Sequence, residues 1–175
     1  QSLSSAASDV YKRQVQNYQN ADVLTQLNDQ IEERLGIQSA VGKIINHHIF
    51  LNDWAKASGL PITLIVEGMD PFAHAYSAEQ IRIGSDDELI KLLNQGHQSR
   101  FSGDIVFTLQ PNCIFYGPYG STHGSGYTYD THVPFLILGG AINAGSTTEK
   151  TSVTDIVDRV AESADLPYAP NSWVQ

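Results

Sequence analysis

Residues 103–111, GDIVFTLQP, contain the clearest strand signal of this chain, and the other elements can be placed around it. The run is rich in β-branched and aromatic residues and ends at a proline, which cannot donate to a strand ladder. A second short strand is predicted at 113–117, CIFYG. The apolar run PFLILGG, at 134–140, is typical of a strand buried on both faces.

Helical and hairpin segments precede the strand. Residues 21–36 carry apolar side chains at three- and four-residue spacing and end at Gly36, which suits a left-handed helix cap. Residues 40–52, AVGKIINHHIFLN, predict two short strands joined by a turn near the two adjacent histidines. Residues 52–59 predict a short helix opened by Asn52 or by the aspartate that follows it. Residues 60–68, LPITLIVEG, fit either a strand or a buried helix.

Capping patterns mark further helices. Ser77 with Gln80 predicts one capping box, and Ser85 with Glu88 predicts a second that opens a helix closing at Gly96. The last helix is predicted within residues 152–167, with Val153, Ile156, Val157 and Val160 on one apolar stripe. Because strands and helices alternate along the chain, the sequence predicts an α/β domain.

Composition excludes several classes of function. The chain has 175 residues, of which 41% are hydrophobic, and a net charge of -9. Only ten Lys and Arg residues are spread along it, so nucleic acid is not expected as a partner. No apolar run reaches the roughly 20 residues of a membrane span, so none is expected. Cys113 is the single cysteine, which excludes an internal disulfide.

The first fourteen residues differ from the rest. QSLSSAASDVYKRQ has no start methionine, no apolar signal-peptide core and no helical or strand periodicity. It is similar to the translated adapter sequences found at the ends of reading frames from shotgun libraries. We therefore interpret residues 1–14 as non-native and expect the native sequence to begin before residue 15.

Residues 120–134, GSTHGSGYTYDTHVP, form a polar loop with two histidines between two predicted strands. Binding groups in α/β proteins are often presented at strand ends. Gly124 and Gly126 allow the backbone to approach a ligand closely, and neutral imidazole is a common zinc ligand. Two interpretations follow: the loop supplies a metal ligand, or it is a surface connection whose histidines, His123 and His132, are incidental.

The sequence THGSGYTYDTHVP, followed by FLILGG, resembles the C-terminal signature of the alkaline phosphatase superfamily. The nearest branch contains the PafA-type alkaline phosphatases and the type I phosphodiesterases and nucleotide pyrophosphatases. SGDIVFTLQP is similar to a strand of that branch, and NHHIFLN and AHAYSAEQI stand before it in the same order. The resemblance covers most of residues 20–170. It implies an alkaline phosphatase-like α/β core with a mixed sheet flanked by helices, truncated at its N-terminus.

The resemblance also assigns roles to individual residues. His123 would be a ligand of one ion in a two-zinc site. His132 would orient the loop, with Asp130 accepting a ring N–H, or would be a structural histidine. Asp104 would support the fold and not bind metal. Three further side chains would pack the loop: Tyr127, Tyr129 and Thr131.

No second metal ligand stands out in the sequence. His47 and His48 are adjacent, so on a strand they would face opposite ways. His74 and His97 are isolated, and each is predicted to be structural or exposed. A catalytic zinc needs three protein ligands, so the remaining ligands and the nucleophile are expected outside this chain.

The resulting expectation is that residues 15–175 are the C-terminal part of a catalytic domain. The whole enzyme would hydrolyse phosphate monoesters through a covalent Thr or Ser phospho-enzyme, with two zinc ions as cofactors and a small-molecule phosphate ester as its partner. Phosphodiesters and nucleotide pyrophosphates are the alternative substrates, and a noncatalytic α/β binding module is the alternative class. The resemblance implies a periplasmic or secreted enzyme, and this chain alone is expected to be inactive.

Overall fold

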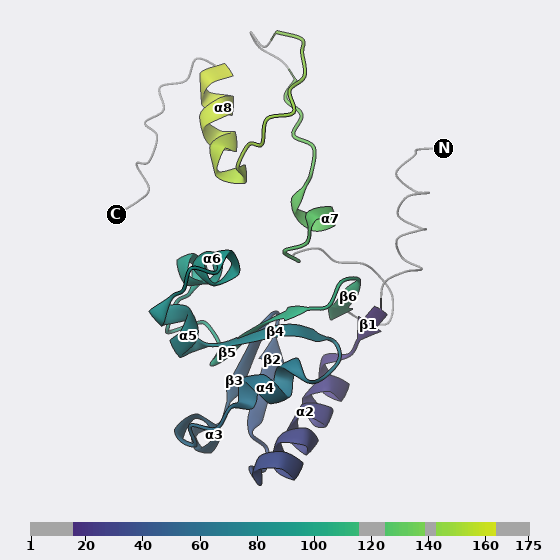
Figure 1. The fold of residues 1–175 in the computed structure, drawn as a ribbon. Helices are drawn as coiled ribbons and strands as arrows, with labels where there is room; N and C mark the ends of the chain where they lie inside the picture. Colours follow the sequence, from purple (N-terminus) through teal and green to yellow (C-terminus); the bar gives the residue numbers. More distant parts are fainter. Residues whose placement is uncertain (1–15, 116–124, 139–142, 164–175) are drawn as a thin grey trace. The chain divides into compact units, whose positions relative to one another are not determined.

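A computed structural model describes residues 16–115, 125–138 and 143–163 of the chain (Figure 1). The described residues fall into two compact units, which divide between Thr131 and His132. The first unit carries the sheet and most of the core, and the second carries an apolar segment and a helix. Each unit is described by itself.

The first unit is built on a four-stranded sheet with the order β2-β3-β5-β4. Its strands are β2 (Val41–Ile45), β3 (His48–Leu51), β4 (Phe72–Ser77) and β5 (Ile105–Leu109). All three neighbouring pairs are antiparallel. The strand predicted from GDIVFTLQP is therefore an inner strand, buried at four of its five positions. The hairpin predicted at 40–52 is confirmed, with Asn46 in its turn at a φ of 52°.

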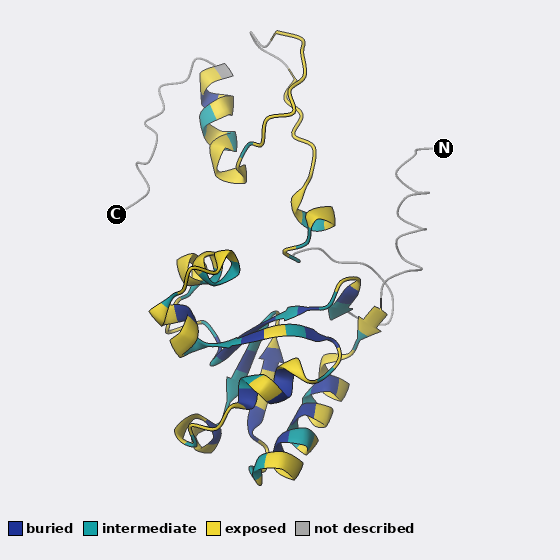
Figure 2. Ribbon diagram, in the orientation of Figure 1, coloured by how far each residue is buried: buried dark blue, intermediate teal, exposed yellow. Residues whose placement is uncertain are grey.

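Two helices, α2 (Asn20–Leu35) and α4 (Ile62–Glu67), cover one face of this sheet (Figure 1). Helix α2 packs against β2, α4 packs against β4, and the two helices contact each other. The apolar stripe of α2 turns Val23, Leu27 and Ile31 into the core, as its spacing predicted (Figure 2). The ambiguous segment at 60–68 thus forms a helix, which buries Ile62, Ile65 and Val66 and leaves Leu64 exposed. Further core residues from the two middle strands are Ile49, Ile105 and Phe107.

A parallel pair lies beside the antiparallel sheet. Strand β1 (Gln16–Tyr18) pairs with β6 (Cys113–Phe115), a partner 97 residues away that sequence periodicity did not reveal. The predicted α/β class is confirmed, because helices accompany strands in both parallel and antiparallel pairing. Phe72, Phe107 and Phe115 meet edge to face beneath this pair, with ring centroids 4.9 to 6.2 Å apart.

The helix caps follow the sequence prediction, except for the second predicted capping box. Gly36 ends α2 with a left-handed φ of 69°, and Asn52, not Asp53, caps α3 (Asp53–Ala57) by accepting from the Ala55 N–H at 2.7 Å. The capping box of Ser77 and Gln80 opens α5 (Ala78–Ile83). These local hydrogen bonds satisfy backbone donors that a helix end leaves unpaired.

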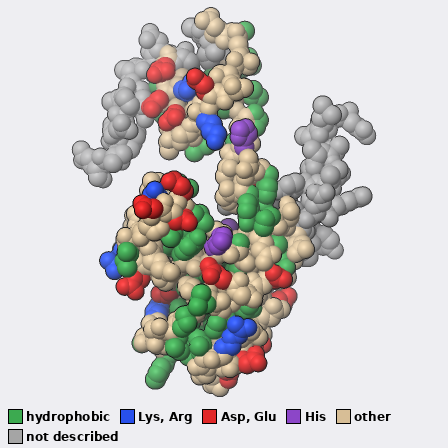
Figure 3. Space-filling view, viewed as in Figure 1, with side chains coloured by type: hydrophobic (Ala, Val, Ile, Leu, Met, Phe, Trp, Pro, Cys, Tyr) green, Lys and Arg blue, Asp and Glu red, His purple; other side chains and the backbone are tan. Residues whose placement is uncertain are grey.

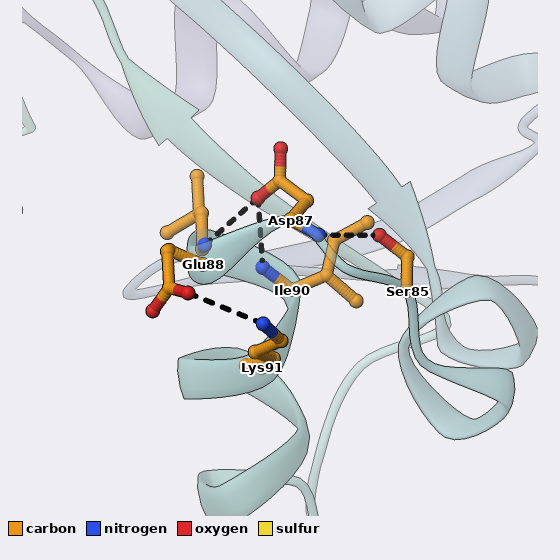
Figure 4. Close-up of polar contacts among 6 residues, drawn as sticks. Ser85, Asp87, Glu88, Ile90 and Lys91 are labelled. Carbon is orange, nitrogen blue, oxygen red and sulfur yellow. Dashed lines mark hydrogen bonds and ion pairs between the residues drawn. The ribbon is translucent and has the colours of Figure 1, made fainter.

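The second predicted capping box is wrong. Helix α6 (Glu88–Gly96) is capped by Asp87, whose Oδ1 accepts from Leu89 N at 2.8 Å and from Ile90 N at 3.2 Å (Figure 4). Ser85 Oγ instead accepts from Asp87 N at 2.9 Å. The helix begins two residues later than a Ser85 cap requires because a carboxylate at the helix start is the stronger acceptor.

The second unit contains a 3-10 turn (Val153–Asp155) that leads into α8 (Ile156–Ser163). This confirms the last predicted helix over its described part. The run predicted as a strand at 134–140 is corrected, because its described residues, 134–138, have no regular secondary structure and no strand pairing. Leu136 and Leu138 are 88% and 102% exposed, so the run is not buried among the described residues. A continuous apolar run forms a strand only when a neighbouring strand is available to pair with it.

The surface carries mixed charge. Figure 3 shows Lys and Arg side chains scattered among Asp and Glu on the face that it presents. None of the helices in the described part of the chain is both long enough and apolar enough to cross a membrane.

Candidate functional site: the histidine loop and its supports

The proposed zinc ligand, His123, lies outside the described residues. The structure describes the loop from Ser125 onward, where the short helix α7 (Thr128–Thr131) forms. The turn is closed by two backbone hydrogen bonds, in which the N–H groups of Asp130 and Thr131 both donate to Tyr127 O. The structure therefore shows how the end of the histidine loop is held, but not where its first histidine lies.

Two tyrosines fasten the end of the loop to the turn that follows β5. Tyr127 donates its hydroxyl hydrogen to Leu109 O at 2.8 Å, and the Tyr129 hydroxyl accepts from Asn112 N at 3.2 Å. The two rings stack with centroids 5.5 Å apart. Burial is the main cause that raises the pKa of Tyr127. Their predicted role as packing residues of the loop is confirmed.

Asp130 also closes the loop on itself. Its Oδ2 accepts from the Ser125 N–H at 2.8 Å, across five residues. The sequence suggested a ring N–H of His132 as the donor to the Asp130 carboxylate. The structure shows the backbone N–H of Ser125 as one donor to it. His132 itself is exposed and is the first residue of the second unit.

The SGD sequence at 102–104 connects the start of β5 to β3 through side-chain contacts. Asp104 Oδ2 accepts from Leu51 N at 2.8 Å and pairs with Lys56 Nζ at 3.4 Å. This confirms that Asp104 supports the fold. A glycine is required at position 103, where the chain passes close to β3, because a Cβ on this residue would lie 2.7 Å from the carbonyl oxygen of Ile49. Sequence reasoning missed this close approach, although a glycine beside a strand is its usual signal.

Two of the remaining histidines, His47 and His48, make defined contacts within the first unit. His47 stacks on Phe107 with centroids 5.5 Å apart, and His48 Nδ1 accepts from Gly103 N at 3.2 Å. Burial lowers the pKa of both imidazoles. His74 is exposed beside the ring of Tyr76, so its predicted structural or exposed character is confirmed.

Metal ligands do not gather in the described part of the molecule. Across residues 16–115, 125–138 and 143–163, no three His, Cys, Asp or Glu side chains stand together in a way that could hold a metal ion. The described residues therefore do not form a zinc site by themselves.

The described residues have the α/β fold of one segment of an alkaline phosphatase. Two solved structures of alkaline phosphatase PafA match this chain. The wild-type enzyme superposes with a TM-score of 0.64 at 20% identity, covering 84% of this chain and 30% of that one. A quadruple mutant superposes with a TM-score of 0.65 at 18% identity, covering 83% and 30%. The resemblance predicted from the histidine loop is thereby confirmed.

Sequence comparison gives the same picture. The chain is 27% identical over 161 residues to a protein named calcium-transporting ATPase from Myroides odoratus, and 23% identical over 158 residues to alkaline phosphatase PafA from Elizabethkingia meningoseptica. These matches cover 83% and 84% of this chain, but only 28% and 29% of the relatives. The chain thus spans less than a third of the length of these relatives. No family model matches it.

Proposed function

We propose that the protein containing this chain is a zinc-dependent phosphatase that hydrolyses phosphate monoesters. The observation that carries the proposal is the agreement between sequence and fold over more than four fifths of the chain, with alkaline phosphatase PafA as the common match. The HGSGYTYDTHVP motif lies in the same chain and contains a histidine suited to zinc. The reaction would proceed through a covalent phospho-enzyme on a Thr or Ser contributed from outside residues 1–175.

His123 is the residue of this chain proposed to bind zinc, and the other ligands would come from outside it. When bound, two zinc ions supply Lewis acidity to the phosphoryl oxygens and to the leaving group. The role of the described residues is to hold the loop. Tyr127 anchors it to the carbonyl of Leu109, and Asp130 fixes the backbone at Ser125, only two residues after His123. A periplasmic or secreted location is proposed on the same similarity.

The proposal is tested by recovering the source DNA upstream of Val15 and expressing the whole reading frame. A frame that adds a Thr or Ser nucleophile, separated Asp ligands and an Asp-His pair supports the proposal. The purified protein should hydrolyse p-nitrophenyl phosphate and contain zinc by elemental analysis. Bis(p-nitrophenyl) phosphate and ATP are included as substrates, because diesters are the alternative and one relative is named an ATPase.

Histidine variants separate the metal ligand from the other histidines. His123→Ala is expected to lower both zinc content and hydrolysis, the latter by roughly 100-fold or more. His74→Ala is the matched control, since His74 is exposed on β4, and it should retain both. Full activity and zinc content in His123→Ala would contradict the assignment. A native start near residue 15, with no hydrolysis by the product, would support the noncatalytic binding module instead.

A further inference from the structure

The four-stranded sheet is joined at its centre by few backbone pairs. Strand β3 pairs with β5 only at His48 with Val106 and at Ile49 with Ile105, whereas β4 and β5 pair at five positions. A further backbone bond, from Phe107 N to His47 O, continues the same register, and Ile49, Ile105 and Phe107 share one buried core. Side-chain contacts from His48 and Asp104 to backbone groups add to these.

Both histidines contact β5 or the residues just before it, one at each end of the short ladder. His48 Nδ1 accepts from the Gly103 N–H at 3.2 Å, just before β5 begins. His47 O accepts from the Phe107 N–H at 3.0 Å, and the His47 ring lies parallel to the Phe107 ring, with an interplanar angle of 3°. Both imidazoles are half-buried.

The bond to Gly103 requires one protonation state of His48. Because the backbone N–H is the donor, Nδ1 must carry a lone pair, and so the neutral ring must carry its hydrogen on Nε2. A protonated ring has N–H groups at both nitrogens and would direct a donor at a donor. Gly103 lies close to β3 at this point, since a Cβ built on it would stand 2.7 Å from Ile49 O.

We propose that His48 forms a pH-sensitive latch that holds the start of β5 on the β2–β3 hairpin when its ring is neutral and loosens this attachment when the ring is protonated. The surrounding charges favour this behaviour. His97, at the end of α6, adds a third imidazole whose charge would oppose that of His48. The Asp104 carboxylate, which could stabilise an imidazolium, is engaged by Leu51 N and by Lys56 from α3. Lys43, on β2, lies 4.5 Å above the Phe50 ring and adds positive charge to this region.

The direction of the pH effect follows from the pKa values. Burial is the largest cause that lowers the pKa of His48, and the charges of His47 and His97 lower it further. Burial also lowers the pKa of His47, but a backbone hydrogen bond with Phe107 acts in the opposite direction, so the latch is assigned to His48 alone. The unfolded chain therefore binds more protons than the folded one between the folded pKa and the ordinary histidine value of about 6.5. The latch is fully effective above that ordinary value and is lost as the pH falls through the lowered folded pKa.

Amide hydrogen exchange on the 175-residue chain tests the latch. Between pH 7.5 and pH 5, the protection factor of the Gly103 amide, corrected for its intrinsic exchange rate, should fall by about 3- to 10-fold, the equivalent of one lost hydrogen bond. The Phe107 amide, which donates to the backbone carbonyl of His47, should change much less. The Ile31 amide in α2 should change much less. An equal loss of protection at Ile31 would mean general acid unfolding and would overturn the proposal, as would unchanged protection at Gly103.

Two variants and one spectroscopic measurement complete the test. His48→Asn places a carbonyl oxygen near the Nδ1 position without a titrating group, and should flatten the pH dependence at Gly103. His74→Asn, at an exposed position of β4, should leave it as in the wild type. If His48→Asn does not fold, nitrogen NMR of the wild-type imidazoles decides. The Nε2–H tautomer of His48 at pH 7.5 supports the latch, and the Nδ1–H tautomer or an imidazolium at that pH overturns it.

Discussion

Gly103→Ala is expected to be among the most damaging small substitutions in the first unit. Residue 103 is buried where the chain enters β5 and crosses the backbone of β3. An added Cβ would stand 2.7 Å from Ile49 O, 2.9 Å from His48 Cβ and 3.1 Å from Ile49 N. Two of these three atoms belong to the backbone of a buried strand, so the neighbour cannot relieve the clash by changing a rotamer.

The magnitude can be worked out from these contacts. Forcing a methyl group into a well-packed backbone crossing costs about 1–3 kcal/mol. The shift also lengthens the 3.2 Å bond from Gly103 N to His48 Nδ1, which is worth about 0.5–1.5 kcal/mol. Together these effects predict a loss of about 1.5–4.5 kcal/mol in the free energy of unfolding. That is a large share of the roughly 5–15 kcal/mol that stabilises an ordinary domain.

Urea unfolding followed by far-ultraviolet circular dichroism measures this loss. Gly96→Ala is the matched control, because nothing lies within 4 Å of a Cβ at that helical position. It should change the free energy of unfolding by no more than about 1 kcal/mol, and in the stabilising direction if at all. A Gly103→Ala protein within about 0.5 kcal/mol of wild type would refute the close packing described for this crossing.

Further substitutions test individual contacts by the same unfolding measurement. Asp87→Ala should cost about 1 kcal/mol by removing the cap of α6, whereas Asp86→Ala, one residue earlier, should cost clearly less; equal effects would point to charge and not to capping. Tyr127→Phe should cost about 0.5–1.5 kcal/mol through the lost bond to Leu109 O, and an unchanged midpoint would mean that this bond does not hold the loop. Leu27→Ala should cost about 2–5 kcal/mol, since Leu27 is 0% exposed, and a loss below about 1 kcal/mol would contradict its place in the core.

Local rules in the sequence predicted many elements of the first unit. The three-and-four spacing of α2, its left-handed cap at Gly36 and the capping box at Ser77 depend on residues within one or two helical turns. Such signals are complete in the sequence because their partners are close along the chain. Where two local acceptors competed, as at Ser85 and Asp87, the pattern alone chose the wrong one.

The candidate site divides in the same way. The residue types of the HGS and YDTHVP segments suggested a zinc ligand and loop-packing tyrosines, and the contacts of Tyr127 and Tyr129 bear out the second suggestion. The assignment of His123 remains a prediction. The donor that Asp130 meets at Ser125 was not foreseen, because a side chain's choice among nearby backbone groups depends on how the loop turns.

By itself, the sequence determined most of the helices, the hairpin, the strand within 103–111 and the motif that carries the proposed chemistry. The tertiary structure decided which strands pair, since β1 with β6 and β3 with β5 join segments that are distant in the chain. The tertiary structure also decided that the apolar run at 134–138 is exposed despite its composition. The physical reason is common to both: a strand and a buried face are defined by partners, and partners far away in sequence leave no periodic mark on either segment.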